Sequence, residues 1–478
     1  MRTPVVRGIF AMIRTLAIVF LTTAAAVLAQ PVFVIEGNYN PYSAGKSPIS
    51  TWDGTAFTPA NVMVGQSMQA PRPLQSFRRA DGRIFVVAIQ PFYNNNVFTF
   101  EYAGGQFLPM GQTRAGVSYT AAYGVVLSPD CTRAYVLTLT GHLWPIDISD
   151  LFNPVVGNPI DVPGGQKFDI RPQGDRILVT GYNAVVHDVD LLTGAVTTLN
   201  LNQPYYQPQI RYSPDGSFAY FALEDALHSF VVLNTASYPA TLAKIEPGPG
   251  GSFGMADVAF HPTLKRAYFM SWPSGNSVTP SLYVVDTNTH TAIGFTTVLP
   301  GNLAPYQLVM EPDATRMWLV GSFNDTKFYR IPVDAAGVPQ IATLNVIVPA
   351  QTTAVFGMAV PQPVVGATPS FLASLGTRSG TQGARQWPLR VRNAGPVAVF
   401  GAQVSQVVLT QTAGPACSPS VVNPMPMAYG NIAPGATVTS NITINFTGCA
   451  NTVRFKVQAA VGTGANSQLL TVANNQPM

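Results

Sequence analysis

Between residues 31 and 360 one short pattern recurs, and it constrains the fold more than any other feature. An apolar strand enters a turn rich in Pro, Asp and Gly, and a second apolar strand leaves it. The turn and this second strand read RRADGRIFVV at 78–87, LSPDCTRAYVL at 127–137, RPQGDRILVT at 171–180, YSPDGSFAYFA at 212–222, FHPTLKRAYFM at 260–270 and MEPDATRMWLV at 310–320. Self-similarity at a period of about 40–50 residues is typical of a β-propeller, in which each repeat supplies one blade.

One repeat divides readily into four strands, which we expect at 168–171, 175–181, 184–190 and 195–201. Val, Ile, Tyr and Phe dominate their apolar positions, as half-buried pleated surfaces favour. An acidic or amide residue recurs where the third strand of a repeat ends. These residues are Asp147, Asp190, Asn234, Asp286 and Asp334. We expect them to close turns through their own backbone, because Asx side chains commonly do so, and not to form a ladder of metal ligands.

The two ends of the repeat region complement each other. The segment VFVIEG (32–37) starts in the middle of a repeat, and FGMAVPQP (356–363) is an inner strand with no blade after it. If the last strand completes the first blade, no sheet edge is left free. The sequence therefore predicts an all-β chain, with a seven-bladed β-propeller over residues 31–360.

A second domain follows a linker rich in Pro and Gly at 361–370. Residues 371–478 alternate between apolar and polar over several segments, as sandwich strands do. We predict an immunoglobulin-like β-sandwich, or alternatively a small domain of another β type. Cys417 and Cys449 are expected to pair, closing a loop of about 30 residues and stabilising the domain by roughly 3–4 kcal/mol. Cys131 occupies the position of Gly216 in a sister repeat and is expected to be a turn residue.

Residues 1–29 have the pattern of a secretory signal peptide. Arg2, Arg7 and Arg14 precede a short apolar run, and small residues stand before Gln30. Translation from Met12 is an alternative start. We expect a secreted product that is periplasmic, extracellular or on the cell surface, with no membrane span in the mature chain. Removal of the three arginines leaves a net charge of +1 and no basic stripe, so nucleic acid is not an expected partner.

The repeats resemble a known family. SPDGSFAYFALEDALHSFVVLNTAS and HPTLKRAYFMSWPSGNSVTPSLYVVDTNTHTAI are similar to the bacterial surface-protein propeller repeat called the YVTN repeat. The resemblance covers about 31–360 and departs at Gln173-Gly174-Asp175 and at Leu264. The tail resembles immunoglobulin-like modules of bacterial surface proteins. The resemblance implies a fold, since lactonases, quinoprotein dehydrogenases and interaction scaffolds share this shape.

No residues in the sequence form a catalytic or metal-binding pattern. Gly250 to Gly254 match G-x-S-x-G, but the motif lies in a Pro/Gly-rich loop without the helix that a nucleophile elbow requires. The histidines lack zinc-ligand spacing. Asp188 to Gly194 resembles a calcium loop only faintly, because Leu192 stands where an oxygen ligand is needed. We therefore predict no catalytic residue, no metal and no cofactor.

Two sets of residues are candidates for binding. The first is a polar ring expected to face the central channel, at the matching position of the inner strands: Gln75, Lys167, Gln209, Asp257 and Gln307. It could hold a ligand or only ordered water. The second is a set of aromatic residues on loops expected at one end of the disc: Tyr39, Tyr42, Phe92, Tyr93, Tyr205, Tyr206, Trp272 and Phe323. Exposed aromatics among amides suit a glycan or a protein partner.

We therefore predict a secreted or surface-associated, non-catalytic and monomeric propeller that binds a protein or polysaccharide through its aromatic loop face. The alternative is a propeller enzyme, a lactonase or a quinoprotein-like oxidoreductase, acting through the channel around Asp257 and Gln209. A purely structural envelope protein is a third interpretation.

Overall fold

The computed structural model describes most of the chain after residue 30. The described residues are 31–37, 46–52, 54, 57–65, 73–79, 81–90, 95–116, 122–181, 185–201, 209–223, 230–235, 242–245, 253–272, 281–297, 305–321, 327–347, 354–364, 370–395, 398–463 and 466–478. Within them the fold is all-β, as predicted, and the helical elements are short 3-10 turns such as η3 (Ile341–Thr343) and η4 (Gln382–Ala384). None of the helices in these residues is long and apolar enough to span a membrane.

The described residues between 32 and 363 form seven sheets. The first has the strand order β29-β1-β2-β3, and the second β30-β4-β5-β6-β7. Their strands are β1 (Val32–Gly37), β2 (Lys46–Trp52), β3 (Phe57–Gly65), β4 (Leu74–Arg78), β5 (Ile84–Gln90), β6 (Asn96–Ala103), β7 (Gln106–Arg114), β29 (Ala354–Ala359) and β30 (Gln362–Pro363). β29 pairs antiparallel with β1, with Val34 opposite Met358. This is the predicted pairing of the two ends of the repeat region.

The third and fourth sheets follow the repeats closely. The third is ordered β11-β10-β9-β8, with β12 also on β10, and the fourth is β13-β14-β15-β16. Their strands are β8 (Ala122–Leu127), β9 (Arg133–Thr138), β10 (His142–Asp147), β11 (Val155–Val156), β12 (Ile160–Asp161), β13 (Gly165–Ile170), β14 (Arg176–Gly181), β15 (Val185–Asp190) and β16 (Val196–Asn200). The four strands expected in the repeat at 168–201 are all present.

The remaining three sheets of this region each join four consecutive strands. The fifth contains β17 (Gln209–Tyr212), β18 (Phe218–Ala222), β19 (Phe230–Asn234) and β20 (Leu242–Ile245). The sixth contains β21 (Phe253–Phe260), β22 (Arg266–Trp272), β23 (Ser281–Asp286) and β24 (Thr291–Thr297). The seventh contains β25 (Pro305–Met310), β26 (Arg316–Gly321), β27 (Phe328–Pro332) and β28 (Asn345–Ile347).

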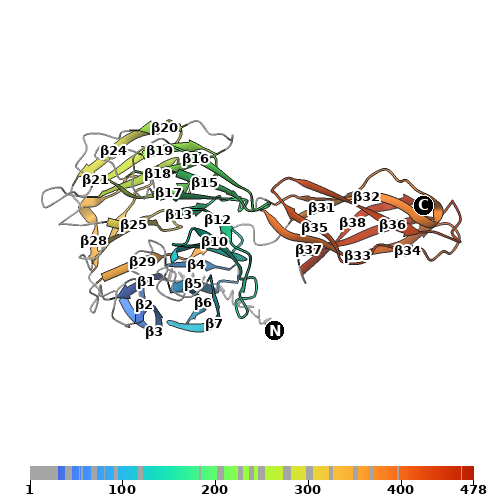
Figure 1. Cartoon of the computed structure of the whole chain (residues 1–478), viewed down its shortest axis with the longest axis horizontal. Coiled ribbons are helices and arrows are strands. Elements are labelled where there is room, and N and C mark those ends of the chain that lie inside the picture. The colour runs from blue at the N-terminus through green and yellow to red at the C-terminus, as the bar shows by residue number, and fades with distance from the viewer. Residues whose placement is uncertain are drawn as a thin grey trace, which may run out of the picture.

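The seven sheets surround a common centre (Figure 1). One strand of each sheet, here called the inner strand, contacts the inner strands of both neighbouring sheets. The contacts run in a closed cycle through β29, β4, β8, β13, β17, β21 and β25. This arrangement is β-propeller-like, and every sheet packs against two others.

Alternation along each strand explains this packing. In β14, Ile177 and Val179 belong to the apolar cluster shared with the third sheet, whereas Leu178 between them belongs to the cluster shared with the fifth. Successive side chains of a strand point to opposite faces, so both faces of the sheet are buried. A fully buried side chain of this kind contributes roughly 1.5–3 kcal/mol.

Two further sheets form an elongated domain beyond residue 370 (Figure 1). Their orders are β31-β32-β36-β34 and β35-β33-β37-β38. The strands are β31 (Phe371–Leu375), β32 (Arg385–Asn393), β33 (Val399–Ala413), β34 (Ser420–Val421), β35 (Met427–Ile432), β36 (Thr437–Asn445), β37 (Arg454–Thr463) and β38 (Asn466–Pro477). The predicted disulfide between Cys417 and Cys449 is present, with Cα atoms 5.3 Å apart.

Specific contacts join this domain to the third and fourth sheets. The Ala398 N–H donates to the Gln173 carbonyl at 2.7 Å, and Asn431 Nδ2 donates to the Leu192 carbonyl at 2.9 Å. The Arg133 guanidinium lies 4.5 Å from the centroid of the Phe400 ring. In the expected linker, β30 pairs in parallel with β4, so at least these linker residues are part of the second sheet.

Candidate functional site

The aromatic set cannot be placed from the structure. Seven of its members lie outside the described residues: Tyr39, Tyr42, Phe92, Tyr93, Tyr205, Tyr206 and Phe323. Trp272 is the last residue of β22, where its backbone is paired with Phe253, and its side chain is also outside the description. The aromatic binding face therefore stays a prediction.

The five polar ring positions lie on inner strands, one each on β4, β13, β17, β21 and β25. Gln75 is half-buried, and the other four, Lys167, Gln209, Asp257 and Gln307, are buried. The structure thus places all five on the strands nearest the common centre of the seven sheets, and their role as a channel ring stays a prediction. Their contacts decide whether they are available to a ligand.

Asp257 bridges three inner strands. Its Oδ2 accepts hydrogen bonds from Arg211 Nη2 in β17 and from the backbone N–H of Leu308 in β25, both at 3.0 Å. Asp257 is only 1% exposed, so its charge depends on Arg211 for compensation, because an unpaired buried charge is costly.

The same kind of link recurs at two neighbouring junctions. Asp169 Oδ2 accepts the N–H of Tyr212 at 2.8 Å, joining β13 to β17. Gln307 exchanges two hydrogen bonds with the backbone of Met358, joining β25 to β29. Asp169, Asp257 and Gln307 therefore fasten one inner strand to the next, and five consecutive inner strands are connected in this way.

A cavity of about 370 Å³, here called the axial pocket, opens where several inner strands enter their turns. Its lining comes from the second, third, fourth, sixth and seventh sheets and from β30. The lining residues are Gln75, Ser76, Phe77, Val126, Leu127, Ser128, Pro129, Cys131, Asp169, Ile170, Pro262, Pro312, Gln362 and Pro363. One proline from each of three repeat turns and one from β30 make part of the pocket lining apolar.

The polar groups of the axial pocket are few. Ser76 is 3% exposed, and its Oγ has no hydrogen-bond partner among the described residues. Gln75, Ser128, Asp169 and Gln362 are the other polar side chains of the described lining apart from Cys131, and this lining contains no lysine, arginine or histidine. A buried hydroxyl without a partner is unfavourable, so Ser76 is suited to hydrogen bond with a molecule in the pocket.

Cys131 also lines the axial pocket. Its φ of 53° is in the left-handed region, as is that of Gly216 at the matching turn position (69°), so the expected turn role agrees with its backbone. Burial raises the pKa of the Cys131 thiol to about 12. A thiol held neutral in this way is a poor nucleophile.

The recurring acids close turns. Asp147, Asp190, Asp286 and Asp334 each accept a backbone N–H two residues onward through Oδ1, at 2.8–2.9 Å. In the faint calcium-loop match, Asp188 is a buried strand residue whose Oδ2 accepts a hydrogen bond from Arg176 Nη1. The described residues contain no group of three or more His, Cys, Asp or Glu placed to hold a metal ion.

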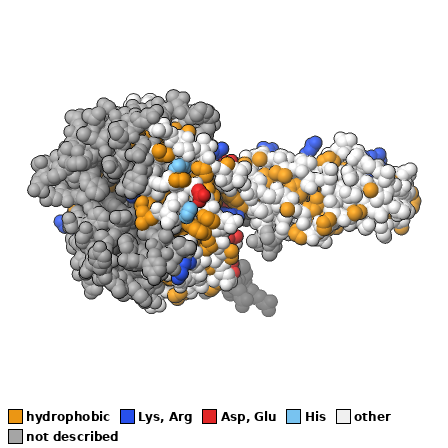
Figure 2. Space-filling view, viewed as in Figure 1, with side chains coloured by type: hydrophobic (Ala, Val, Ile, Leu, Met, Phe, Trp, Pro, Cys, Tyr) orange, Lys and Arg blue, Asp and Glu red, His pale blue; other side chains and the backbone are white. Residues whose placement is uncertain are grey.

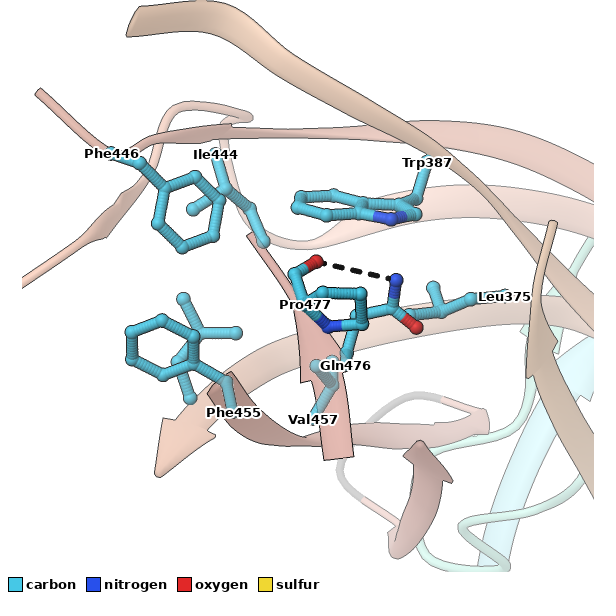
Figure 3. A pocket seen from close by; sticks show the side chains of 9 residues that line it. Leu375, Trp387, Ile444, Phe446, Phe455, Val457, Gln476 and Pro477 are labelled. Carbon is cyan, nitrogen blue, oxygen red and sulfur yellow. Dashed lines mark hydrogen bonds between the residues drawn. The ribbon is translucent and has the colours of Figure 1, made fainter. Parts of the chain in front are cut away.

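The nucleophile-elbow match lacks its structural context. Residues 250–252 are outside the description, and Phe253 begins the strand β21, whereas the elbow motif needs a helix after the serine. The elongated domain also has an apolar gap between its sheets, lined by Leu375, Trp387, Phe446, Phe455 and Pro477 among others (Figure 3). This gap has no room for a water molecule, so it is part of the domain core.

Comparison with known proteins gives relatives in fold only. No family model matches the chain, and no curated protein does. A candidate 6-phosphogluconolactonase from Bacteroides fragilis is similar in structure, with a TM-score of 0.50 and 12% identity, over 69% of this chain and 98% of that one. A second from Bacteroides uniformis gives a TM-score of 0.51 and 12% identity, over 68% and 98%. At this identity the likeness shows a β-propeller-like fold.

Proposed function

We propose that residues 31–360 are a seven-bladed β-propeller, that residues 371–478 are an immunoglobulin-like sandwich, and that the chain is an exported, non-catalytic binding protein. The closed cycle of seven inner strands supports the blade number. Two four-stranded sheets with a disulfide support the sandwich assignment. In this proposal the sandwich is a spacer or surface tether for the propeller.

One observation carries the choice of binding over catalysis. The carboxylates and amide that the repeats place at the centre, Asp169, Asp257 and Gln307, are engaged by backbone groups of adjacent inner strands. A general acid or base must reach the proton that it transfers, and these groups are occupied in holding the blades together. The axial pocket and the aromatic loop face are then noncovalent binding surfaces, the latter for a protein or polysaccharide.

Binding through the aromatic face can be tested on an array of bacterial polysaccharides and surface proteins. Replacement of Trp272 and Tyr93 by Ala should abolish binding to whichever partner the native chain retains. Replacement of Phe152 by Ala, at an exposed position in the third sheet's connection, is the control and should leave binding intact. Unchanged affinity in the double variant would contradict the site, and failure to retain any partner would contradict the binding function.

Lactone hydrolysis is the second candidate, because Asp169 lies in the lining of the axial pocket and the two structural neighbours are named for that activity. A phosphorylated lactone suits this pocket poorly, since its described lining supplies no cation. We expect the chain to hydrolyse 6-phosphogluconolactone and gluconolactone no faster than buffer does. Hydrolysis that is lost in Asp169→Asn, with the melting temperature retained, would establish the enzyme instead.

A further inference from the structure

A second cavity lies outside the axis, between the turns of the fifth and sixth sheets. This cavity, here called the turn groove, has a volume of about 470 Å³, within the range of roughly 300–1,000 Å³ that small-molecule sites occupy. Its lining residues are Ser213, Pro214, Asp215, Phe218, Phe260, His261, Pro262, Thr263, Leu264, Lys265, Thr287 and Asn288. Figure 2 shows hydrophobic side chains, with a few acidic and histidine side chains among them, on the described part of the repeat region.

Comparison with the junction between the fourth and fifth sheets explains why the groove between the fifth and sixth sheets is open. Between the fourth and fifth sheets, Gln173 Nε2 donates to the Asp215 carbonyl at 2.8 Å, and its Oε1 packs against Gly216. In the fifth turn, Asp215 stands where Gln173 stands in the fourth. Its shorter side chain keeps Oδ1 in its own turn, where it accepts from Ser213 Oγ at 2.6 Å and from the Ser217 N–H at 3.1 Å. It reaches the sixth turn through Oδ2, which lies 2.8 Å from Lys265 Nζ.

The sixth turn also departs from the repeat. Leu264 takes the place of Gly216 but lies outside the left-handed region that the glycine occupies. Instead, the N–H of Leu264 donates to Nδ1 of His261 at 2.9 Å. The groove thus lies where two neighbouring turns differ from their sisters, and the other repeats do not share this combination of residues.

The chemistry of the lining favours a neutral ligand. Lys265 Nζ lies 2.8 Å from Asp215 Oδ2, so these two side chains, the one ammonium group and the one carboxylate in the described lining, compensate each other. His261 contributes an uncharged ring that accepts a backbone hydrogen bond. The exposed side chains of Thr263 and Asn288 add both donors and acceptors at the rim.

Two aromatic rings complete the lining. Phe218 and Phe260 are half-buried and belong to a larger aromatic group, because Tyr220 packs edge-on against Phe260 at 5.2 Å and His290 edge-on against Phe218 at 4.5 Å. The described lining therefore combines the apolar surface of two aromatic rings with hydrogen-bond donors and acceptors at the rim, and it carries no net charge. Such a lining complements a molecule that has one apolar face and a rim of hydroxyl groups.

We propose that the turn groove binds a neutral sugar unit of an oligosaccharide. Pro262 lines both the turn groove and the axial pocket, so the rest of the oligosaccharide extends from the groove toward the axis. None of the described lining residues belongs to the aromatic set, so this proposal does not depend on the aromatic loop face. It would make the turn side of the molecule a second binding surface.

The test uses the full chain and isothermal titration with neutral trisaccharides of glucose, galactose and N-acetylglucosamine. We expect at least one to bind the native chain. Thr263→Trp places a large ring in the groove from an exposed position, and it should weaken binding at least tenfold. Asn288→Ala should weaken it about three- to tenfold. Thr315→Trp, at an exposed position in the seventh sheet's turn, is the matched control and should bind as the native chain does.

Three results would overturn the proposal: no binding by any trisaccharide, binding that Thr263→Trp leaves unchanged, or preference for glucuronate or inorganic phosphate over the neutral sugars. The variants Trp272→Ala and Tyr93→Ala should retain trisaccharide binding. Failure of the aromatic face is therefore distinguishable from failure of the turn groove.

Discussion

Gln307 in β25 and Met358 in β29 are joined by two hydrogen bonds. Gln307 Oε1 accepts the Met358 N–H at 2.8 Å, and Gln307 Nε2 donates to the Met358 carbonyl at 3.0 Å. The side-chain amide thus pairs with the backbone as a neighbouring strand would. Because β29 completes the first sheet, this pair lies at the point where the end of the repeat region meets its beginning.

Gln307→Ala should weaken this closure. Two buried backbone groups of Met358 would lose their partner, and each unmade bond costs about 1–3 kcal/mol. We expect the free energy of unfolding of the repeat region to fall by about 2–4 kcal/mol, measured by calorimetry on the full chain. Gln112→Ala, at an exposed position of β7, is the control. Equal melting temperatures for both variants would contradict the role given to Gln307.

Asp257 and Arg211 should behave as a coupled pair. Arg211→Ala leaves the buried Asp257 carboxylate without its cation, and Asp257→Ala removes the acceptor of both Arg211 and the Leu308 N–H, so each substitution should destabilise the repeat region. In a double-mutant cycle we expect a coupling free energy of about 1–3 kcal/mol, as for residues in direct contact. Additive effects of the two substitutions would show that the ion pair does not hold β17 to β21.

The strands and turns of the repeat region were predictable because their signals are local. The turn at 213–217 contains its own Asp cap and glycine, and the strand after it has its own alternation. The pairing of β29 with β1 was predictable from two incomplete repeats. The β-propeller-like, all-β arrangement follows from these patterns.

The partners of the central polar residues were not predictable in the same way. The sequence places Asp257 and Gln307 at one repeat position, yet one accepts from a guanidinium and the other pairs with a backbone unit. These partners come from neighbouring sheets. The sequence pattern of one repeat does not indicate how its sheet is positioned against the next sheet. The turn groove was missed for a related reason, since it depends on how Gln173 and Asp215 meet the next turn.

Ala314 offers a test of the turn geometry. Its φ of 62° lies in the left-handed region, where a side chain costs roughly 1–2 kcal/mol. Glycine avoids this cost but has more freedom in the unfolded chain, by about 0.4–1 kcal/mol. Ala314→Gly should therefore raise the free energy of unfolding by up to about 1 kcal/mol. Ala336→Gly, in a turn without positive φ at that residue, should lower it, and the reverse order would contradict the argument.

Cys131 should be unreactive in the folded chain. Its thiol is buried, and burial raises its pKa to about 12, whereas alkylation requires the thiolate. We expect no iodoacetamide adduct at pH 8 by mass spectrometry until the chain is unfolded in denaturant. Cys417 and Cys449 serve as the internal control, because their disulfide stays unlabelled until reductant is added. Rapid labelling of Cys131 in the folded chain would point to a chemical role at the axial pocket.

His261 gives the repeat region a dependence on pH. Burial, and after it the Arg266 cation, lowers the pKa of His261 below 6.5. The neutral ring also accepts the Leu264 N–H. The unfolded chain therefore takes up this proton more readily. The contribution to stability is complete above pH 6.5 and is lost as the pH falls through the folded-state pKa. Burial lowers the pKa of His290 as well, so the contribution of His290 to stability is also lost as the pH falls.

His261→Ser isolates this effect, since Ser213 holds the same place in the fifth turn and its Oγ accepts the Phe218 N–H at 3.1 Å. Melting temperatures measured between pH 7.5 and 5 should fall less steeply for the variant than for the native chain. Above pH 7 the two should differ little, because the serine can still accept a backbone hydrogen bond in the turn. His142→Ser, at a half-buried position in the third sheet, controls for loss of a histidine as such. Parallel curves for His261→Ser and the native chain would mean that protonation of His261 does not limit stability at acid pH.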